Sequence, residues 1–374
     1  MTTPPRSHRF AVVLAGLTMV LAGCSGSRPS PSADVTETSI ATTTTTPPGC
    51  VAEKECRLRD PADRQGLYIG AAVDPDRLDT DPRYAATVAR EFNSITAENA
   101  MKWTALQPRR ESWNFGPADR LVAFAEAHDI AVHGHTLVWG QDIGNGLPAW
   151  VRDLDDPAEL EAAIDAHITT VVGRYRGRVD RWDVVNEPLQ ISGGELDQNH
   201  LLDVLGPAYI GQAFRVAHRA DPAARLYLNE NLVERLPVKA AALLALIDQL
   251  LAEDVPIHGV GLQAHQFDGV GPPAGELARL VTALRDRGLD VAITELDIPL
   301  TQETGLQDQA ETYHRLVTEC LEGGCREITV WGVDDAHTWL DQFLGREHTD
   351  PLLFDKDLRP KPAYDAVLDA LDDR

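Results

Sequence analysis

Eight short runs of apolar and β-branched residues recur along the chain from about residue 65, and longer stretches with helical periodicity lie between them. The apolar runs occupy residues 67–73, 92–96, 131–139, 182–186, 225–229, 259–265, 291–296 and 328–333. The helical stretches occupy residues 118–128, 157–175, 208–220, 238–253, 273–287 and 306–322. Strands that alternate with helices indicate βαβ units and a parallel sheet. Eight such units in roughly 310 residues predict an α/β fold of the (β/α)8 TIM barrel type.

A doubly wound open sheet is the alternative to the barrel. That fold usually carries a glycine-rich loop after its first strand. The first run is followed instead by Asp74, Pro75 and Asp76, and the chain has no internal repeat of fixed period. The barrel is therefore the favoured prediction.

The N-terminal residues have the pattern of an export signal. Arg6 and Arg9 precede an apolar run over residues 10–21, which is too short to span a bilayer. Small residues then lead to Cys24, in a pattern that resembles the lipobox of bacterial lipoproteins. We expect residues 1–23 to be a lipoprotein signal peptide and Cys24 to carry a lipid that holds the protein at the cell-envelope surface. A plain secretory signal is the alternative.

Serine, threonine and proline dominate the stretch that follows the signal. Such a composition cannot bury a core, so residues 24–60 are expected to form a disordered linker. The catalytic domain is then expected to span residues 61–374.

Four more cysteines form two local pairs. Because export permits disulfides, we expect the bridges Cys50–Cys56 and Cys320–Cys325, although four cysteines allow three connectivities. The spacings lack the CxxC pattern of a zinc site, so no metal is expected.

Composition narrows the class of protein. The chain has 374 residues, of which 43% are hydrophobic and 25% charged, as in ordinary globular proteins. Lysine and arginine total 34 against 58 aspartates and glutamates, so the net charge is −24. Such a surface repels phosphate backbones, which argues against a nucleic-acid partner.

Polar residues cluster where the predicted strands end. Six strand ends carry them: Glu98 and Asn99; His133 and His135; Asn186 and Glu187; Asn229, Glu230 and Asn231; Gln263 and His265; Glu295 and Asp297. One polar residue at a strand end is usually a cap or turn former. Six ends together are better explained by an active site, because barrel enzymes build theirs at that rim.

Two carboxylates, Glu187 and Glu295, each follow a strongly apolar run. A carboxylate pair is the equipment for cleaving a glycosidic bond, since one group protonates the leaving oxygen and the other attacks or stabilises the anomeric carbon. His265 between Glu295 and Asp297 could keep Glu295 ionised, which suits a nucleophile. The charge of Glu295 would then favour the protonated form of Glu187, which suits a general acid. A separation of about 5–5.5 Å would imply double displacement with retention.

The motifs resemble those of glycoside hydrolase family 10, the β-1,4-xylanases. The matching segments are FNSITAENAMKW, VHGHTLVWG, WDVVNEP, GVGLQAH, ITELDIP, ITVWGV and PLLFDKDLRPKPAYDAV, which together span nearly the whole folded part. The resemblance implies a (β/α)8 barrel and a retaining reaction. It also implies Glu187 as acid/base and Glu295 as nucleophile.

Roles in substrate binding follow from the same resemblance. It implies that His265 and Asp297 orient the nucleophile. It assigns substrate contacts to Glu98, Asn99, Lys102, His135, Trp139, Asn186, Gln263, Trp331 and Trp339. The tryptophans suit sugar stacking, because an apolar ring covers the C–H face of a pyranose.

Two segments depart from the family pattern. Gly140 stands where a histidine is usual, and the loop over residues 141–146 is longer. The family's Asn-Asp-Tyr-Asn is replaced by Asn229, Glu230, Asn231 and Leu232, so an aromatic platform on the leaving-group side is missing. Both changes bear on how a long xylan is held, and neither touches the catalytic pair.

The sequence therefore predicts a retaining endo-1,4-β-xylanase that needs no cofactor, binds a polysaccharide, touches a membrane only through its lipid and is a monomer. One alternative is the same mechanism on another β-1,4-glycan or a small β-glycoside. Another is a polysaccharide-binding lipoprotein without catalysis.

Overall fold

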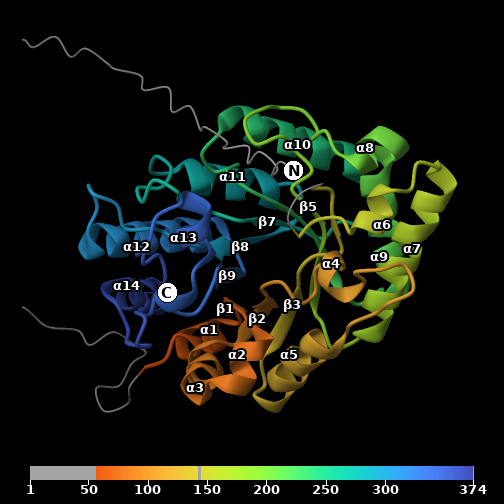
Figure 1. Ribbon diagram of the computed structural model, residues 1–374. Helices are drawn as coiled ribbons and strands as arrows, with labels where there is room; N and C mark the ends of the chain where they lie inside the picture. Colours follow the sequence, from red (N-terminus) through yellow and green to blue (C-terminus); the bar gives the residue numbers. More distant parts are fainter. Residues whose placement is uncertain (1–55, 142–144, 374) are drawn as a thin grey trace, which may run out of the picture. The chain divides into compact units, whose positions relative to one another are not determined.

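The computed structural model describes residues 56–141 and 145–373. The expected signal peptide, Cys24 and Cys50 lie outside the described residues, as does most of the expected linker. The folded body over the described residues is a closed parallel barrel with helices around it (Figure 1).

Nine short strands line the barrel in the order β3-β2-β1-β9-β8-β7-β6-β5-β4, and an additional β3–β5 pairing closes it. Their bounds are β1 Tyr68–Val73, β2 Ser94–Ala97, β3 Ala131–Gly134, β4 Val138–Trp139, β5 Arg181–Asn186, β6 Arg225–Glu230, β7 Gly259–Leu262, β8 Asp290–Leu296 and β9 Glu327–Val330. Every pairing is parallel. Because β3 and β4 share one position against β5, the barrel has eight positions, and the predicted fold is confirmed.

The expected strand over residues 131–139 is divided in two. Gly134 pairs with Trp182 and Val138 with Val185, so the chain advances four residues (138 − 134) against three on β5 (185 − 182). A Cβ at Gly134 would lie 2.2 Å from the Trp182 ring, so only glycine allows this close approach. The extra residue interrupts the ladder directly below the polar rim.

Six of the helices match the six predicted stretches: α5 Gly116–Ala127, α7 Pro157–Arg174, α9 Ala208–Ala220, α10 Pro237–Ala252, α11 Glu276–Arg285 and α12 Leu306–Gly323. Most of the others are shorter: α1 Arg59–Gln65, α2 Pro75–Thr80, α3 Pro82–Glu91, α4 Trp103–Leu106, α6 Ala149–Arg152, α8 His200–Leu205, α13 Trp339–Leu344, α14 Pro362–Asp372 and the 3-10 turn η1 Asp335–His337.

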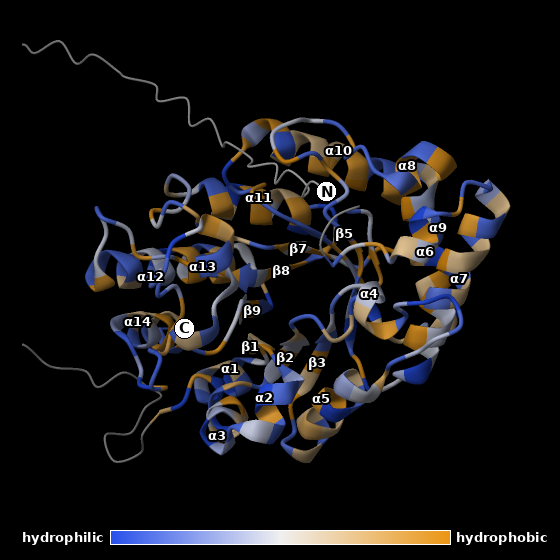
Figure 2. Ribbon diagram, in the orientation of Figure 1, coloured by the Kyte–Doolittle hydropathy of each residue, from blue (hydrophilic) through white to orange (hydrophobic). Residues whose placement is uncertain are grey.

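Each long helix carries both apolar and polar residues along its length, as Figure 2 shows. In α7 the side chains of Leu160, Ile164, Ile168, Val171 and Val172 are buried, and this spacing forms one apolar stripe. The carboxylate of Asp156 accepts the backbone N–H groups of Ala158 and Glu159 and so caps the helix. Among the described residues, no helix combines the length and apolarity needed to cross a bilayer.

One of the two expected disulfides is confirmed. Cys320 in α12 is bonded to Cys325, which lies just before β9. The other expected bridge involves Cys50, outside the described residues.

Candidate active site

The polar residues predicted for the site lie together at the carboxyl end of the barrel strands. Glu98, Asn99 and Lys102 follow β2; His135 follows β3; Trp139 ends β4; Asn186 ends β5 and Glu187 comes next; Gln263 and His265 follow β7; Glu295 lies in β8 and Asp297 just after it; Trp331 follows β9; and Trp339 begins α13. Parallel strands point their ends in one direction, so the barrel gathers residues that are up to 241 positions apart (339 − 98).

Glu295 is held between an amide and a histidine. Its Oε1 accepts a hydrogen bond from Asn229 Nδ2 at 2.6 Å, and its Oε2 accepts one from His265 Nε2 at 3.1 Å. On its other side, His265 Nδ1 lies 2.9 Å from Asp297 Oδ1. Trp339 Nε1 donates to Asp297 Oδ2 at 2.8 Å, which fixes this carboxylate. Glu295, His265, Asp297 and Trp339 therefore form a relay of four groups.

The relay is charged. Burial alone would lower the pKa of His265, but the negative charge and hydrogen bond of Asp297, together with the bond to Glu295, raise it to about 10. Burial would likewise raise the pKa of Glu295. The hydrogen bond from His265, the charges of His135 and His265, and the bond from Asn229 overcome burial and lower it. Glu295 is therefore an ionised carboxylate at neutral pH.

Glu187 stands in a different environment. It is partly exposed and has φ of 51°, so the chain turns sharply where β5 ends. Its Oε2 accepts hydrogen bonds from Trp139 Nε1 and Gln141 Nε2, both at 3.1 Å, and its Oε1 accepts one from Gln263 Nε2 at 2.8 Å. All three donors are neutral, and they fix the direction of the carboxyl group without an ion pair.

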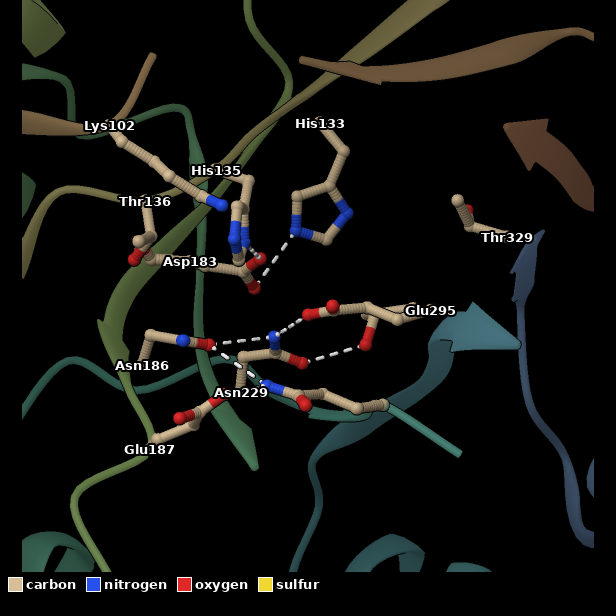
Figure 3. A network of polar contacts seen from close by, with 12 residues as sticks. Lys102, His133, His135, Thr136, Asp183, Asn186, Glu187, Asn229, Glu295 and Thr329 are labelled. Carbon is tan, nitrogen blue, oxygen red and sulfur yellow. Dashed lines mark hydrogen bonds and ion pairs between the residues drawn. The ribbon is translucent and has the colours of Figure 1, made fainter. Parts of the chain in front are cut away.

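A chain of three amides joins the two carboxylates. Gln263 Nε2, which donates to Glu187, lies 3.3 Å from Asn186 Oδ1. Asn229 Nδ2 donates to that same oxygen at 2.8 Å as well as to Glu295 (Figure 3). Thr294 Oγ1 donates to Asn229 Oδ1 at 2.7 Å, which sets the orientation of the Asn229 amide. Both carboxylates therefore belong to one hydrogen-bonded network, with amides between them.

His135 is oriented by a buried network that extends into the barrel. Its Nδ1 donates to Asp183 Oδ2 at 2.9 Å, and His133 Nε2 donates to Asp183 Oδ1 at 3.0 Å (Figure 3). Burial would lower the pKa of His133, but Asp183 and Glu327 raise it to about 10. Burial opposes ionisation of Asp183 too, yet His133 and His135 lower its pKa. Glu327 also pairs with Arg181 at 3.2 Å.

Lys102, which follows β2, interacts electrostatically with both carboxylates. Its Nζ donates to Asn99 Oδ1 at 2.9 Å and lies 5.2 Å from the Trp139 ring centre and 6.0 Å from that of Trp331. Burial lowers the pKa of Lys102, although Glu295, Glu98 and Glu187 attract the charged form. The ammonium group of Lys102 therefore lies near three carboxylates, where it can donate hydrogen bonds to sugar hydroxyls.

Both departures from the family pattern have a structural explanation. A Cβ at position 140 would lie 2.6 Å from Asn199 Nδ2, so the side chain of Asn199 occupies the space that a histidine would need. At the end of β6, Asn231 Oδ1 accepts a bond from Lys239 Nζ at 2.6 Å, and Lys239 pairs with Glu230 at 2.8 Å. Position 231 thus supports a buried ion pair where the family has an aromatic residue.

Four contributors to the site received no role from the sequence: Asn229, Thr294, Gln141 and Asp183. Asn229 was signalled by its place at a strand end. Gln141 had no such signal, because it lies in the loop that departs from the family pattern. Within the described ranges, no three His, Cys, Asp or Glu side chains converge as a metal site.

Comparison with known proteins gives a consistent result. The profile of glycosyl hydrolase family 10 matches residues 57–370. "Endo-1,4-beta-xylanase 2" of Claviceps purpurea is 38% identical over 304 residues, which cover 81% of this chain and 87% of that protein. "Endo-1,4-beta-xylanase B" of Thermotoga neapolitana is 35% identical over 337 residues, which cover 87% of this chain and 95% of that protein. The crystal structure of xylanase 10B from Thermotoga petrophila in complex with xylobiose is 34% identical and superposes with a TM-score of 0.80, covering 86% of this chain and 98% of that one. The chain therefore belongs to glycosyl hydrolase family 10.

Proposed function

We propose that the protein is a retaining endo-1,4-β-xylanase, with Glu295 as nucleophile and Glu187 as acid/base. The observation that carries the proposal is the contrast between the two carboxylates. Glu295 is ionised beside cationic His265, whereas the hydrogen-bond donors to Glu187 are all neutral. The relatives named as xylanases, and the xylobiose complex among them, support xylan as the substrate.

The reaction proceeds in two displacements. First, a carboxylate oxygen of Glu295 forms a bond to the anomeric carbon while the glycosidic C–O bond breaks, and Glu187 gives its proton to the leaving oxygen. Water then attacks the anomeric carbon, Glu187 takes a proton from it, and the Glu295 ester bond breaks. Both carboxyl groups return to their starting states, and the anomeric configuration is retained.

The surrounding side chains hold the sugar during these steps. Asn186 and Gln263 lie between the carboxylates, where an amide can bond the 2-hydroxyl of the reacting sugar. His135, held by Asp183, and Lys102, held by Asn99, provide further donors from the opposite wall. Trp139, Trp331 and Trp339 supply ring faces, and Glu98, next to Asn99, completes the sugar contacts.

A trapping experiment tests the roles. An activated 2-deoxy-2-fluoro xylobioside should leave its glycosyl group on Glu295, as read by mass spectrometry of peptides. In Glu295→Ala the label should be absent and turnover of an aryl xylobioside should fall by several orders of magnitude, with the fold intact. A label on another residue, or near-normal turnover by the variant, would remove Glu295 from the nucleophile role. An α-anomer as first product, seen by NMR, would refute retention.

A second candidate is the same chemistry on another β-1,4-glycan. The departures from the family pattern at positions 140 and 231 favour this second candidate. One relative, "Exoglucanase XynX" of Acetivibrio thermocellus, is 37% identical over 320 residues, although these cover only 28% of that protein. Reducing ends released from xylan, carboxymethyl cellulose and mannan separate the candidates. Release from cellulose or mannan at the rate seen with xylan would overturn the choice of xylan.

We further propose that the protein is exported as a monomeric lipoprotein, with signal peptide 1–23, linker 24–60 and catalytic domain 61–374. The support is the LAGC pattern at Cys24. Incorporation of radiolabelled fatty acid should be lost in Cys24→Ala. Labelling that persists in this variant would exclude Cys24 as the site.

A further inference from the structure

The turn that carries Glu187 has a backbone conformation that its own residues do not favour. Glu187 has φ of 51°, in the left-handed region that side chains other than glycine rarely adopt, and such a residue persists only where the surrounding structure holds it. The next residue is Pro188, which has no N–H, and its carbonyl accepts the Asp197 N–H at 2.8 Å from the segment that follows the turn. The turn is therefore fastened to the barrel through the N–H groups on either side of the proline, those of Glu187 and Leu189.

Both of these N–H groups donate to β6. The Glu187 N–H donates to the backbone oxygen of Asn229 at 2.9 Å, and the Leu189 N–H donates to Glu230 Oε2 at 3.0 Å. The first bond needs only the backbone of β6, whereas the second needs one particular side chain. Glu230 is the last residue of β6 and is completely buried, so a buried carboxylate fixes the second end of the turn.

Lys239, which is also completely buried, holds Glu230 from α10. Its ammonium group lies 2.8 Å from Glu230 Oε1 and donates to Asn231 Oδ1 at 2.6 Å, and the Asn231 N–H donates to Glu230 Oε1 at 2.9 Å. Because these two donors take Oε1, the other oxygen is directed to the Leu189 N–H. We call Glu230, Asn231 and Lys239 the anchor cluster.

Stability alone does not explain the anchor cluster. A buried ion pair loses so much hydration that well-packed apolar residues in its place are often as stable or more so. In addition, Lys239 is the third residue of α10, where the helix dipole disfavours a cation. An apolar pair could fill the same space, but it could not accept the Leu189 N–H. The acceptor is therefore the property that the polar cluster supplies and an apolar pair would not.

We propose that Glu230 and Lys239 are positioning residues for the acid/base: Glu230 fixes the Glu187 turn through the Leu189 N–H, and Lys239 fixes Glu230. Successive side chains of a strand point to opposite faces, so neighbouring positions of β6 support the two catalytic groups from different sides. Asn229 bonds the nucleophile, and Glu230, on the side that Lys239 reaches from α10, bonds the acid/base turn. This inference rests on the proposed role of Glu187.

The test compares substrates that do and do not need a proton from Glu187. A phenyl xylobioside has a poor leaving group and needs the proton, whereas a dinitrophenyl xylobioside does not. In Glu230→Leu/Lys239→Met, which leaves no unpaired buried charge, kcat/KM should fall about ten- to a hundredfold on the phenyl substrate and less than about twofold on the other, because a misplaced acid loses most of its contribution.

A second variant keeps the polar character of the cluster. In Glu230→Gln the single amide oxygen should turn to the Lys239 ammonium, so the amide nitrogen faces the Leu189 N–H and cannot accept it. The side-chain volume is unchanged and Lys239 keeps its bond to Asn231, so this variant should fold. It should show the same difference between the two substrates. A cooperative urea transition checks the fold of every variant.

A matched control removes a second buried ion pair of the same kind. Lys361 pairs with Asp335 Oδ2 at 2.8 Å, and Asp335 Oδ1 accepts the Leu352 N–H at 2.8 Å. In Asp335→Leu/Lys361→Met any loss of kcat/KM should be equal on the two substrates, because this pair holds the segment before α14 and not the Glu187 turn.

The outcomes separate this inference from the proposed function. If Glu187→Ala itself loses equally on both substrates, the proposed role of Glu187 fails. If Glu187→Ala loses more on the phenyl substrate but the anchor variants lose equally on both, or lose nothing, the positioning role is refuted while the acid/base assignment stands. A difference of the same size in the Asp335→Leu/Lys361→Met control would also refute it. Should the apolar pair fail to fold, Glu230→Gln decides.

Discussion

Replacing Asn229 by leucine should raise the pH at which the enzyme becomes active. The amide of Asn229 is buried and donates to Glu295 Oε1 at 2.6 Å. Leucine has a similar shape but no N–H, so Glu295 loses one hydrogen-bond donor while the space stays filled. Because this donor is among the causes that lower the pKa of Glu295, the variant should have a higher pKa at this carboxyl.

The magnitude follows from the type of bond. A hydrogen bond to a charged group contributes about 1.5–3 kcal/mol. One pKa unit corresponds to about 1.36 kcal/mol, so the acidic limb of kcat/KM should move up by about 1–2 pH units. The limb should not move further, because the bond from His265 and the charges of His135 and His265 remain.

Stability should follow the same linkage. A carboxyl whose folded pKa is lowered adds stability above its unfolded pKa, and this contribution is lost as the pH falls through the folded pKa. The free energy of unfolding should therefore differ more between wild type and Asn229→Leu at pH 7 than at the acid end of the folded range, as measured by urea titration.

The assay is the pH profile of kcat/KM on an aryl xylobioside, with Thr294→Val as the matched control. Thr294 Oγ1 orients the Asn229 amide at 2.7 Å but leaves its donor in place, so this variant should shift the limb in the same direction by less. An acidic limb that stays at its wild-type position in Asn229→Leu, with the variant folded, would refute the reasoning.

Three further changes test other parts of the structure. Lys239→Met breaks a buried ion pair and should cost about 3–5 kcal/mol of stability in urea titration; the loss should be larger at pH 8 than at pH 5, because burial raises the pKa of Glu230 to about 7. A Lys239→Met/Glu230→Gln double variant that recovers no stability would contradict this account. Glu187→Ala should lose far more activity on xylan than on a dinitrophenyl xylobioside, and equal losses would argue against a proton donor there. Joint replacement of Cys320 and Cys325 by serine should cost about 2 kcal/mol with kcat unchanged, because the short bridge lies before β9 and away from the strand ends that carry the site.

The fold was predictable because its signal is repeated. Each buried parallel strand reads as an apolar run and each outer helix as a periodic stretch, so eight units reinforce one another. The break between β3 and β4 was not predictable, since it depends on the Trp182 ring packing against Gly134 from a strand nearly fifty residues away. Short elements such as α4 and α13 were missed because one turn carries too little periodicity.

The site was predictable as a set of positions, but not as a set of bonds. Polar residues after apolar runs indicated Glu187 and Glu295, and the family resemblance added their neighbours. Which donors face Glu187 depends on its positive φ and on a loop that departs from the family pattern, where Gln141 lies. Phe343 stands four residues after Trp339, a spacing typical of a buried helical face, so its exposure could be known only from the structure.

The distribution of charge explains why Glu187 suits the role that changes protonation. The other buried acids of the site form ion pairs with cations. Asp183 pairs with His133, Glu327 pairs with Arg181, and both Glu295 and Asp297 pair with His265. Protonating any of these acids would take an anionic partner away from a buried cation, which is energetically unfavourable. Glu187 is hydrogen-bonded only to neutral Trp139, Gln141 and Gln263, so a proton that it gains or loses takes no hydrogen-bonded partner from a cation.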